Sequence, residues 1–231
     1  MQSVSVWGRR LVACGLLSGV LCTSDASAAT RTWTGNGADS LTSTPANWAG
    51  NQVPQDGDDL VFPLSGVTGR IVTQNLNVQF QSMTFASDPL QPYHVAGDVS
   101  IIDRIELDAG PMDFGSGTLT LVQNGMTPAD ITFVAAAGTE LVINQAIAGP
   151  ALATVHTQGP GRVTFGYSNS YAGATVIESG TLRLQTDLSL GVSGGPNALI
   201  KTGATLEMND PIGTIYHPVQ FSDGSTLNCT G

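Results

Sequence analysis

The sequence predicts an all-β fold: a right-handed parallel β-helix with coils of about 21 residues and an irregular N-terminal cap. The first supporting observation is composition, because glycine is abundant and glycine or proline interrupts almost every candidate helix. The second is a series of short stretches in which apolar and polar residues alternate, as they do in half-buried strands. The third is the even spacing of these stretches along the chain.

The repeating unit is a glycine followed almost at once by a strand. A sandwich has turn signals roughly every 8–12 residues without a longer period, whereas a fixed period of twenty-odd residues is typical of a solenoid. Coils of this length stack about 4.8 Å apart, so inward Val, Leu, Ile and Phe side chains form one thin core. Seven such units occur at spacings of 19 to 23 residues, beginning at Gly97, Gly117, Gly138, Gly161, Gly180, Gly203 and Gly224.

The first 29 residues have the pattern of a secretory signal peptide. Arg9 and Arg10 precede the apolar stretch Leu11–Leu21, and the small residues Ala26–Ala28 provide the cleavage signature. The apolar stretch is shorter than the roughly 20 residues that a membrane-spanning helix needs. We therefore expect residues 1–29 to be removed on export and no membrane-spanning segment in the mature chain.

The cysteines give little constraint on the fold. Cys14 follows a short lipoprotein-like sequence, which makes lipid attachment there the alternative to simple cleavage. With Cys14 and Cys22 removed, Cys229 is the last cysteine, and the mature chain forms no intramolecular disulfide. Its stability must come from burial and from backbone hydrogen bonds.

Residues 30–66 are expected to form an irregular entry segment and cap, with at most one short strand up to Pro63. Trp33 and Trp48 most simply cover the open hydrophobic end of the stack, which would otherwise expose its core. The alternative is that either ring stacks on a sugar.

Residues 67–231 are expected to form the β-helix domain, incomplete at its C-terminus because the sequence stops just after a strand begins. The predicted strands are Arg70–Val72, Val78–Phe80, Ser82–Phe85, Val99–Ile102, Arg162–Phe165, Thr175–Ile177 and Thr181–Leu184.

The expected mature chain is strongly acidic. All but two of the eight Lys and Arg residues follow residue 29, as do all but one of the eighteen Asp and Glu residues. This charge argues against the phosphate backbone of a nucleic acid as a partner, and equally against an anionic membrane surface.

One stretch resembles a known repeat. Its pattern is roughly N-x-Y-x-G-x-T-x-[VI]-x-x-G-x-L-x-[LV], and the matching positions are Asn169, Tyr171, Gly173, Thr175, Ile177, Gly180, Leu182 and Leu184. This pattern is similar to the autotransporter-associated β-strand repeat, also called the passenger-associated transport repeat. The segment from Gly159 to Phe165 resembles the strand that leads into it, and the entry segment resembles the opening of many secreted proteins that carry it.

The resemblance implies a secreted or surface-exposed bacterial β-helical passenger that acts as a stalk or adhesin. Surface glycans or other surface proteins are the partners it implies. The matched positions build the coil, and the resemblance transfers no catalytic role to any of them. Only one full copy is present, with Ala172 and Ala174 where the family often has Thr and Gly.

Two segments carry carboxylates that could hold calcium. Asp56, Asp58 and Asp59 could offer oxygens to the ion, although an EF-hand's ligand order and distal Glu are missing. The segment Gly35–Leu41, which contains Asp39, matches most of a calcium-binding nonapeptide that works in stacked copies. Asp residues in such loops also make ordinary turns and caps.

An acidic stretch supplies the alternative function, that of a carbohydrate-active β-helix. Paired carboxylates can act as acid and base on a glycosidic bond if they share one face. Interleaved isoleucines and Leu107 also fit an ordinary strand with one solvated face. The acidic residues are Asp98, Asp103, Glu106, Asp108 and Asp113.

His94, His156 and His217 lack the spacing of known metal motifs. No serine lies in a nucleophile elbow, and no phosphate or dinucleotide loop occurs in the sequence. We therefore assign no catalytic residue, no cofactor and no metal ligand from the sequence.

Overall fold

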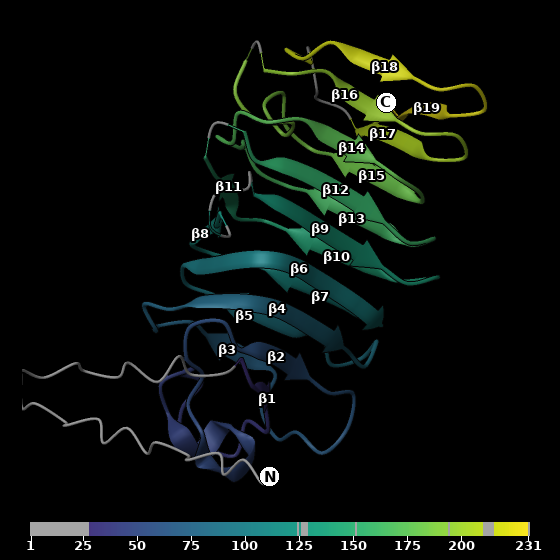
Figure 1. Ribbon diagram of the computed structural model, residues 1–231. Coiled ribbons are helices and arrows are strands. Elements are labelled where there is room, and N and C mark those ends of the chain that lie inside the picture. The colour runs from purple at the N-terminus through teal and green to yellow at the C-terminus, as the bar shows by residue number, and fades with distance from the viewer. Residues whose placement is uncertain are drawn as a thin grey trace, which may run out of the picture.

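The computed structural model describes residues 28–123, 125, 129–150, 152–193, 195–209 and 215–230. The chain winds into a rod whose coils follow one another from the N-terminal to the C-terminal end (Figure 1). Two parallel sheets run along the rod, so the predicted all-β solenoid is confirmed. The expected signal peptide falls almost wholly on residues 1–27, which lie outside the described residues.

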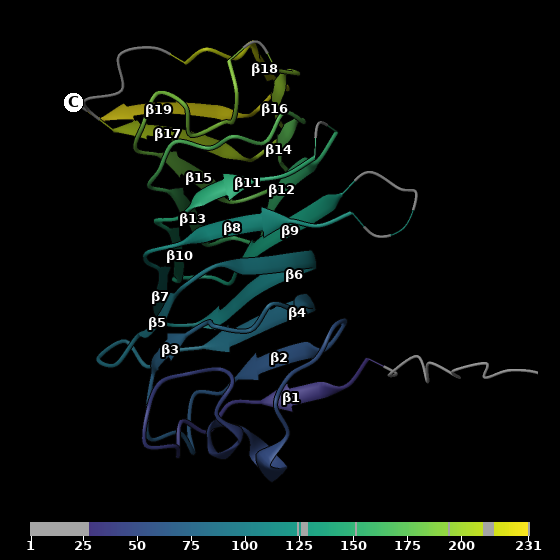
Figure 2. The same ribbon diagram turned by 90° about the vertical axis from the view of Figure 1, so that its left-hand side faces the viewer.

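Sheet I has eleven strands, nine of which form one continuous parallel path. The other two, β8 and β11, lie at the side of the rod between the two sheets (Figure 2). Its strands are β1 (Thr30–Thr32), β2 (Asp59–Phe62), β4 (Gln79–Ala86), β6 (Val99–Ala109), β8 (Thr118–Leu121), β9 (Asp130–Ala135), β11 (Ala146–Ala148), β12 (Thr154–Gln158), β14 (Thr175–Ile177), β16 (Ala198–Ile200) and β18 (Val219–Phe221).

Sheet II has eight strands, again all parallel. Two 3₁₀ turns, η1 (Pro45–Asn47) and η2 (Ala49–Asn51), lie in the entry segment. The strands of sheet II are β3 (Ile71–Thr73), β5 (Tyr93–Ala96), β7 (Pro111–Phe114), β10 (Glu140–Ile143), β13 (Arg162–Phe165), β15 (Thr181–Leu184), β17 (Thr205–Asn209) and β19 (Thr226–Thr230).

The core is a set of side-chain rows that run along the rod. Each inward residue sits over the equivalent residue of the coil below, because parallel pairing places them at the inter-strand spacing. Phe133 and Phe165 meet edge to face inside the rod, with ring centroids 5.7 Å apart. One row of sheet II contains Tyr93, Met112, Leu141, Val163, Leu182, Leu206 and Leu227.

The two tryptophans of the entry segment are buried, at 1% and 2% exposure. Trp33 and Trp48 meet edge to face, with centroids 5.1 Å apart, and both contact Phe62 of β2. Each indole N–H donates to a backbone carbonyl, that of Gly69 for Trp33 and that of Thr42 for Trp48. This burial agrees with the prediction that both rings cover the end of the core, and it leaves neither ring face available to a sugar.

Several predicted strand boundaries are wrong. Two short strands, not one, precede Pro63, and they already pair in parallel. The two strands predicted between Val78 and Phe85 form the single strand β4, because a register shift between Phe80 and Ser82 absorbs the break in alternation. The strand predicted at Val99–Ile102 continues to Ala109 as β6.

The even glycine spacing combines two different rows. Gly97 and Gly117 precede β6 and β8 of sheet I, whereas the remaining five units precede successive strands of sheet II. The coil length also varies: Met112 pairs with Leu141, 29 positions on, whereas Val163 pairs with Leu182, 19 positions on. The longer coil accommodates the side strand β8, so the sequence period only approximates the structural one.

Candidate functional site

The segment that resembles a known repeat lies in the C-terminal half of the stack and runs from the end of β12 through β13 and β14 to β15. Its asparagine, Asn169, is 5% exposed and joins three coils. Asn169 Oδ1 accepts a hydrogen bond from the backbone N–H of Ile147 at 2.8 Å, in the coil before. Its Nδ2 donates to the carbonyl of Ser189 at 2.5 Å, in the coil after. The amide therefore satisfies a backbone N–H on β11 and a backbone carbonyl in the turn at Ser189.

Tyr171 of the same coil is completely buried, and its hydroxyl shares a 2.6 Å hydrogen bond with the hydroxyl of Thr175. Burial raises the pKa of the Tyr171 phenol, and the Thr175 hydrogen bond lowers it by less. Tyr171 is therefore a neutral packing residue and not an acid or base.

Glycine is required in this coil where its backbone passes against a neighbour. A Cβ on Gly180, whose φ is +69°, would collide with the carbonyl of Gly159. A Cβ on Gly173 would collide with the carbonyl of Ala153. These positions of the repeat thus make the close packing and hydrogen bonds on which the stacking of coils depends.

The structure separates the acidic stretch that suggested carbohydrate chemistry. Asp113 lies on β7 of sheet II, where it pairs with His94. Asp98 accepts a hydrogen bond from the N–H of Thr118 and lines a hollow of about 240 Å³. Asp113 therefore lies on a different sheet from the carboxylates of β6, whereas Asp98 lies just before that strand.

The other three acidic residues stay together on β6 of sheet I. Asp103 and Asp108 are exposed, whereas Glu106 is partly buried and forms an ion pair with Arg104 at 3.4 Å. The structure therefore brings together Asp103, Glu106 and Asp108 on one strand and leaves the remaining acidic residues elsewhere.

The carboxylates of the two candidate calcium segments already bind protein groups. Asp58 accepts from Arg31 and from the N–H groups of Ala29 and Gln55. The other three carboxylates accept as well: Asp56 from the N–H of Gln79, Asp59 from Ser82, and Asp39 from Leu41, Thr44 and Asn47. Among the described residues, no group of three or more His, Cys, Asp and Glu side chains is arranged to hold a metal ion.

Asp58 fixes the start of the stack, because its bonds tie β1 to the loop before β2. Burial raises the pKa of Asp58, but the hydrogen bonds from Arg31, Gln55 and Ala29 together outweigh it and hold the pKa below 3.8. A carboxyl group with a lowered folded-state pKa stabilises the fold above its unfolded pKa, and this stabilisation is lost as the pH falls through the folded value.

We expect Asp58→Asn to lower the free energy of unfolding at pH 7 by about 1–2 kcal/mol, because the neutral amide binds Arg31 more weakly. The difference in the free energy of unfolding between Asp58→Asn and wild type should become smaller when the pH falls below about 4. Thermal unfolding at pH 7 and pH 3 measures both effects. Asp108→Asn, at an exposed position of β6, is the control and should change little. A gap that stays constant between the two pH values would count against the assigned role of Asp58.

Two charged ladders on the outer faces were not predicted. The Glu140–Glu207 ladder lies on sheet II and contains Glu140, Arg162, Arg183 and Glu207, one from each of β10, β13, β15 and β17. Arg183 Nε donates to Glu207 at 2.6 Å and Arg162 to the same carboxylate at 3.3 Å. Glu140 contacts Arg183 at 3.4 Å and Arg162 at 3.8 Å, and accepts from Thr164 at 2.7 Å. The ladder links four successive coils.

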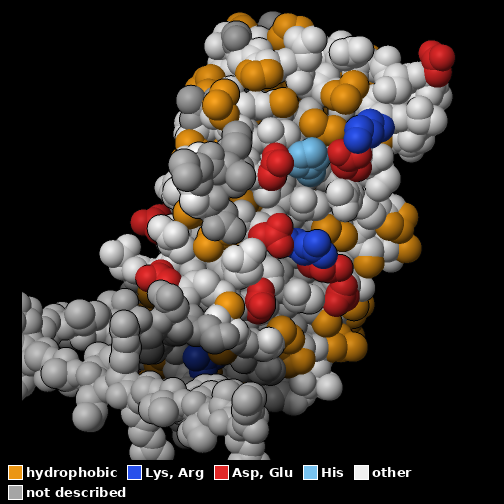
Figure 3. Space-filling model, in the orientation of Figure 1, with side chains coloured by type: hydrophobic (Ala, Val, Ile, Leu, Met, Phe, Trp, Pro, Cys, Tyr) orange, Lys and Arg blue, Asp and Glu red, His pale blue; other side chains and the backbone are white. Residues whose placement is uncertain are grey.

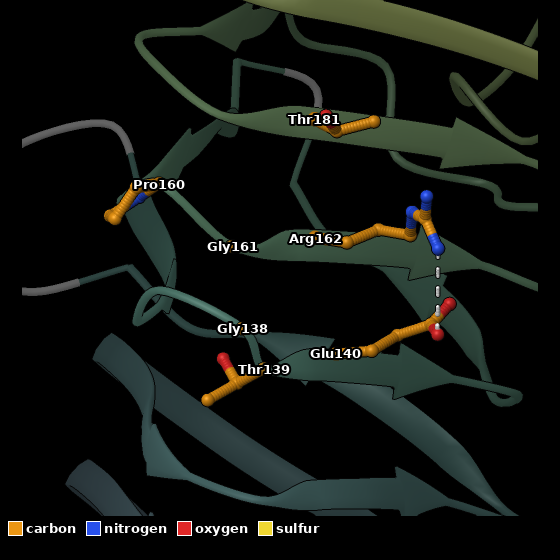
Figure 4. Close-up of a pocket in the computed structure, with 7 residues that line it drawn as sticks. All are labelled: Gly138, Thr139, Glu140, Pro160, Gly161, Arg162 and Thr181. Atoms are coloured by element: carbon orange, nitrogen blue, oxygen red, sulfur yellow. Dashed lines mark ion pairs between the residues drawn. The ribbon is translucent and has the colours of Figure 1, made fainter.

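A hollow of about 330 Å³ lies beside this ladder, at the start of β10, β13 and β15. Figure 4 shows the Glu140 and Arg162 side chains extending side by side along their strands, with an ion pair joining their ends across the strands and Pro160 projecting at the opposite side. Among the described residues that line it, Glu140 is the one carboxylate. Its lining residues are Gly138, Thr139, Glu140, Pro160, Gly161, Arg162 and Thr181.

The second ladder, the Asp130–Lys201 ladder, lies on sheet I and contains Asp130, His156, Glu178 and Lys201. His156 contacts Asp130 through Nε2 at 3.5 Å and Glu178 through Nδ1 at 3.0 Å. Lys201 forms an ion pair with the other oxygen of Glu178. On this face Figure 3 shows a histidine between acidic side chains, with a basic side chain next to one of them.

Only the register of the coils could have revealed these ladders. Glu140 and Arg162 come directly before the inward residues Leu141 and Val163, and Arg183 and Glu207 come directly after theirs. The basic side chains of the described residues contact groups of the chain itself. Arg162, Arg183 and Lys201 belong to the ladders, Arg31 and Arg104 form other ion pairs, and Arg70 lies over the ring of Tyr93.

Among the described residues, no helix has the length and apolar character needed to cross a membrane. A protein-family model described as Passenger-associated-transport-repeat matches residues 157–184. Neither the curated proteins nor the solved structures gave a match. The match covers the coil described above, so the resemblance seen in the sequence is confirmed. Residues 157–184 therefore match the passenger-associated transport repeat, and they form part of a parallel β-solenoid.

Proposed function

We propose that this chain is a secreted, surface-exposed passenger of the autotransporter type, with a non-catalytic role as a stalk or adhesive module. The single observation that carries the proposal is the transport repeat at residues 157–184, within a continuous parallel stack. The positions that match the repeat pattern make turns, core contacts and hydrogen bonds between coils. We propose residues 1–29 as the export signal, residues 30–66 as the cap and residues 67–231 as the solenoid domain.

The surface chemistry supports a passive role. The described basic side chains bind groups of this chain itself, which leaves an acidic face unsuited to polyanions. We therefore propose surface glycans or other surface proteins as the partners, and neither nucleic acid nor an anionic membrane.

The export proposal predicts where the protein is found. The full chain, expressed in a Gram-negative host, should be found outside the cytoplasm, on the cell surface or in the medium. Antibody labelling and protease treatment of intact cells, followed by fractionation, measure this. A variant lacking residues 2–29 is the matched control and should stay in the cytoplasm. Retention of the full chain in the cytoplasm would contradict the proposal.

The alternative function is that of a carbohydrate-active solenoid that uses the acidic residues of β6. Asp103 and Asp108 are exposed on that strand, which is the observation that favours it. The secreted protein should be incubated with a panel of polysaccharides, with and without Ca²⁺, and assayed for reducing ends and unsaturated products. We expect no turnover. Turnover abolished by Asp103→Asn or Glu106→Gln would establish the alternative and reject the non-catalytic role.

A further inference from the structure

His156 is the one side chain of the Asp130–Lys201 ladder that faces two carboxylates at once. It projects from the outer face of β12, between β9 and β14, and is 24% exposed. Asp130 of β9 faces Nε2 and Glu178, directly after β14, faces Nδ1. The two carboxylates belong to the coils before and after that of His156.

The number of protons on the ring decides how many of these contacts are favourable. A neutral imidazole carries one N–H, so its second nitrogen presents a lone pair to the other carboxylate. An imidazolium carries two N–H groups and can donate to both carboxylates at once, with full charge attraction. The protonated ring therefore connects three coils, whereas the neutral ring connects two.

The neighbouring Lys201 and His156 side chains favour the ionised form of Glu178. Burial raises the pKa of Glu178, but Lys201 and His156 together outweigh it and hold the pKa below its ordinary value. Lys201 forms its ion pair with Glu178. Asp130 is the more exposed partner, at 70%. The carboxylate of Glu178 is therefore favoured in its ionised form, in which it attracts a charged imidazole.

We infer that His156 is a pH-sensitive clasp that fastens the coils of β9, β12 and β14 to one another when its ring is protonated. This inference does not depend on the proposed export or adhesion. Imidazole changes its charge between about pH 5 and pH 8, so the clasp closes on acidification within that range. Its stabilisation is present at the acidic end and is lost as the pH rises.

The test compares the melting temperatures of wild type and His156→Gln at pH 5 and pH 8. Glutamine keeps amide donors and an acceptor but carries no charge at either pH. We expect the gap between the two proteins to be wider at pH 5 than at pH 8, by about 2–4 °C. A gap that is equal at the two pH values, or wider at pH 8, would overturn the inference.

A second histidine gives a matched control. His94 lies on sheet II, is 55% exposed, and pairs with the single carboxylate of Asp113. The melting-temperature difference between wild type and His94→Gln should also be larger at pH 5 than at pH 8, but by less than half as much as for His156→Gln. The reason is that solvent screens an exposed pair.

Asp130→Asn removes one of the two carboxylates at an exposed position, and so serves if His156→Gln fails to fold. The melting temperature of Asp130→Asn should change less between pH 5 and pH 8 than that of wild type. An unchanged pH dependence would show that His156 does not bridge the two coils.

Discussion

Gly173→Ala is expected to destabilise the fold more than any other single methyl group added to the repeat coil. The new Cβ would collide with the backbone carbonyl of Ala153, in the preceding coil. Backbone atoms of stacked coils cannot move aside as a flexible side chain can, so the two coils must separate locally. We expect the free energy of unfolding to fall by about 3–5 kcal/mol, which lowers the melting temperature by roughly 10 °C.

Gly115→Ala is the matched control for this change. Gly115 also has an ordinary φ, and a Cβ there would lie 3.7 Å from the Val95 carbonyl, at normal contact distance. This variant should melt within about 2 °C of wild type. Circular dichroism at increasing temperature measures both proteins. If Gly173→Ala has the same melting temperature as Gly115→Ala, the close approach of the coils at Ala153 is not a constraint on the fold.

The sequence was sufficient for the architecture because a solenoid repeats its local chemistry. Glycine before a strand, followed by alternation, recurs in every coil, and the strands at Arg162–Phe165, Thr175–Ile177 and Thr181–Leu184 have the predicted bounds. The same regularity made the predicted series of seven glycines wrong as a single row. Gly97 and Gly117 have the same local pattern as the later glycines but lead into sheet I. Local alternation specifies which face of a strand is buried and not which sheet the strand joins.

The candidate sites were harder to predict, because they depend on contacts between coils. The ion pair of Arg183 with Glu207 joins residues 24 positions apart, and a change of one position in the register would separate them. The aspartates of the loop before β2 were visible in the sequence, but their acceptor bonds to backbone N–H groups were not. A loop rich in Asp has the same composition whether its carboxylates bind calcium or bind the chain.

Asn169→Leu should show that the asparagine of the repeat serves the stacking of coils. Leucine has nearly the same size but cannot accept from the N–H of Ile147 or donate to the carbonyl of Ser189. Both backbone groups would then be buried without a partner, at a cost of about 1–3 kcal/mol each. We expect the free energy of unfolding to fall by about 2–4 kcal/mol, measured by urea denaturation.

Asn77→Leu controls for the change of residue type, because Asn77 lies exposed in the segment before β4. It should alter the free energy of unfolding by less than about 0.5 kcal/mol. If Asn169→Leu were as stable as this control, the hydrogen bonds of the Asn169 amide to Ile147 and Ser189 would not hold the neighbouring coils together. A ligand-binding role for Asn169 would then become the better explanation of its place in the repeat. If Asn169→Leu is much less stable but the protein that still folds is secreted as before, the role of Asn169 is to stabilise the coil. The repeat would then be a unit of folding that carries no binding group of its own.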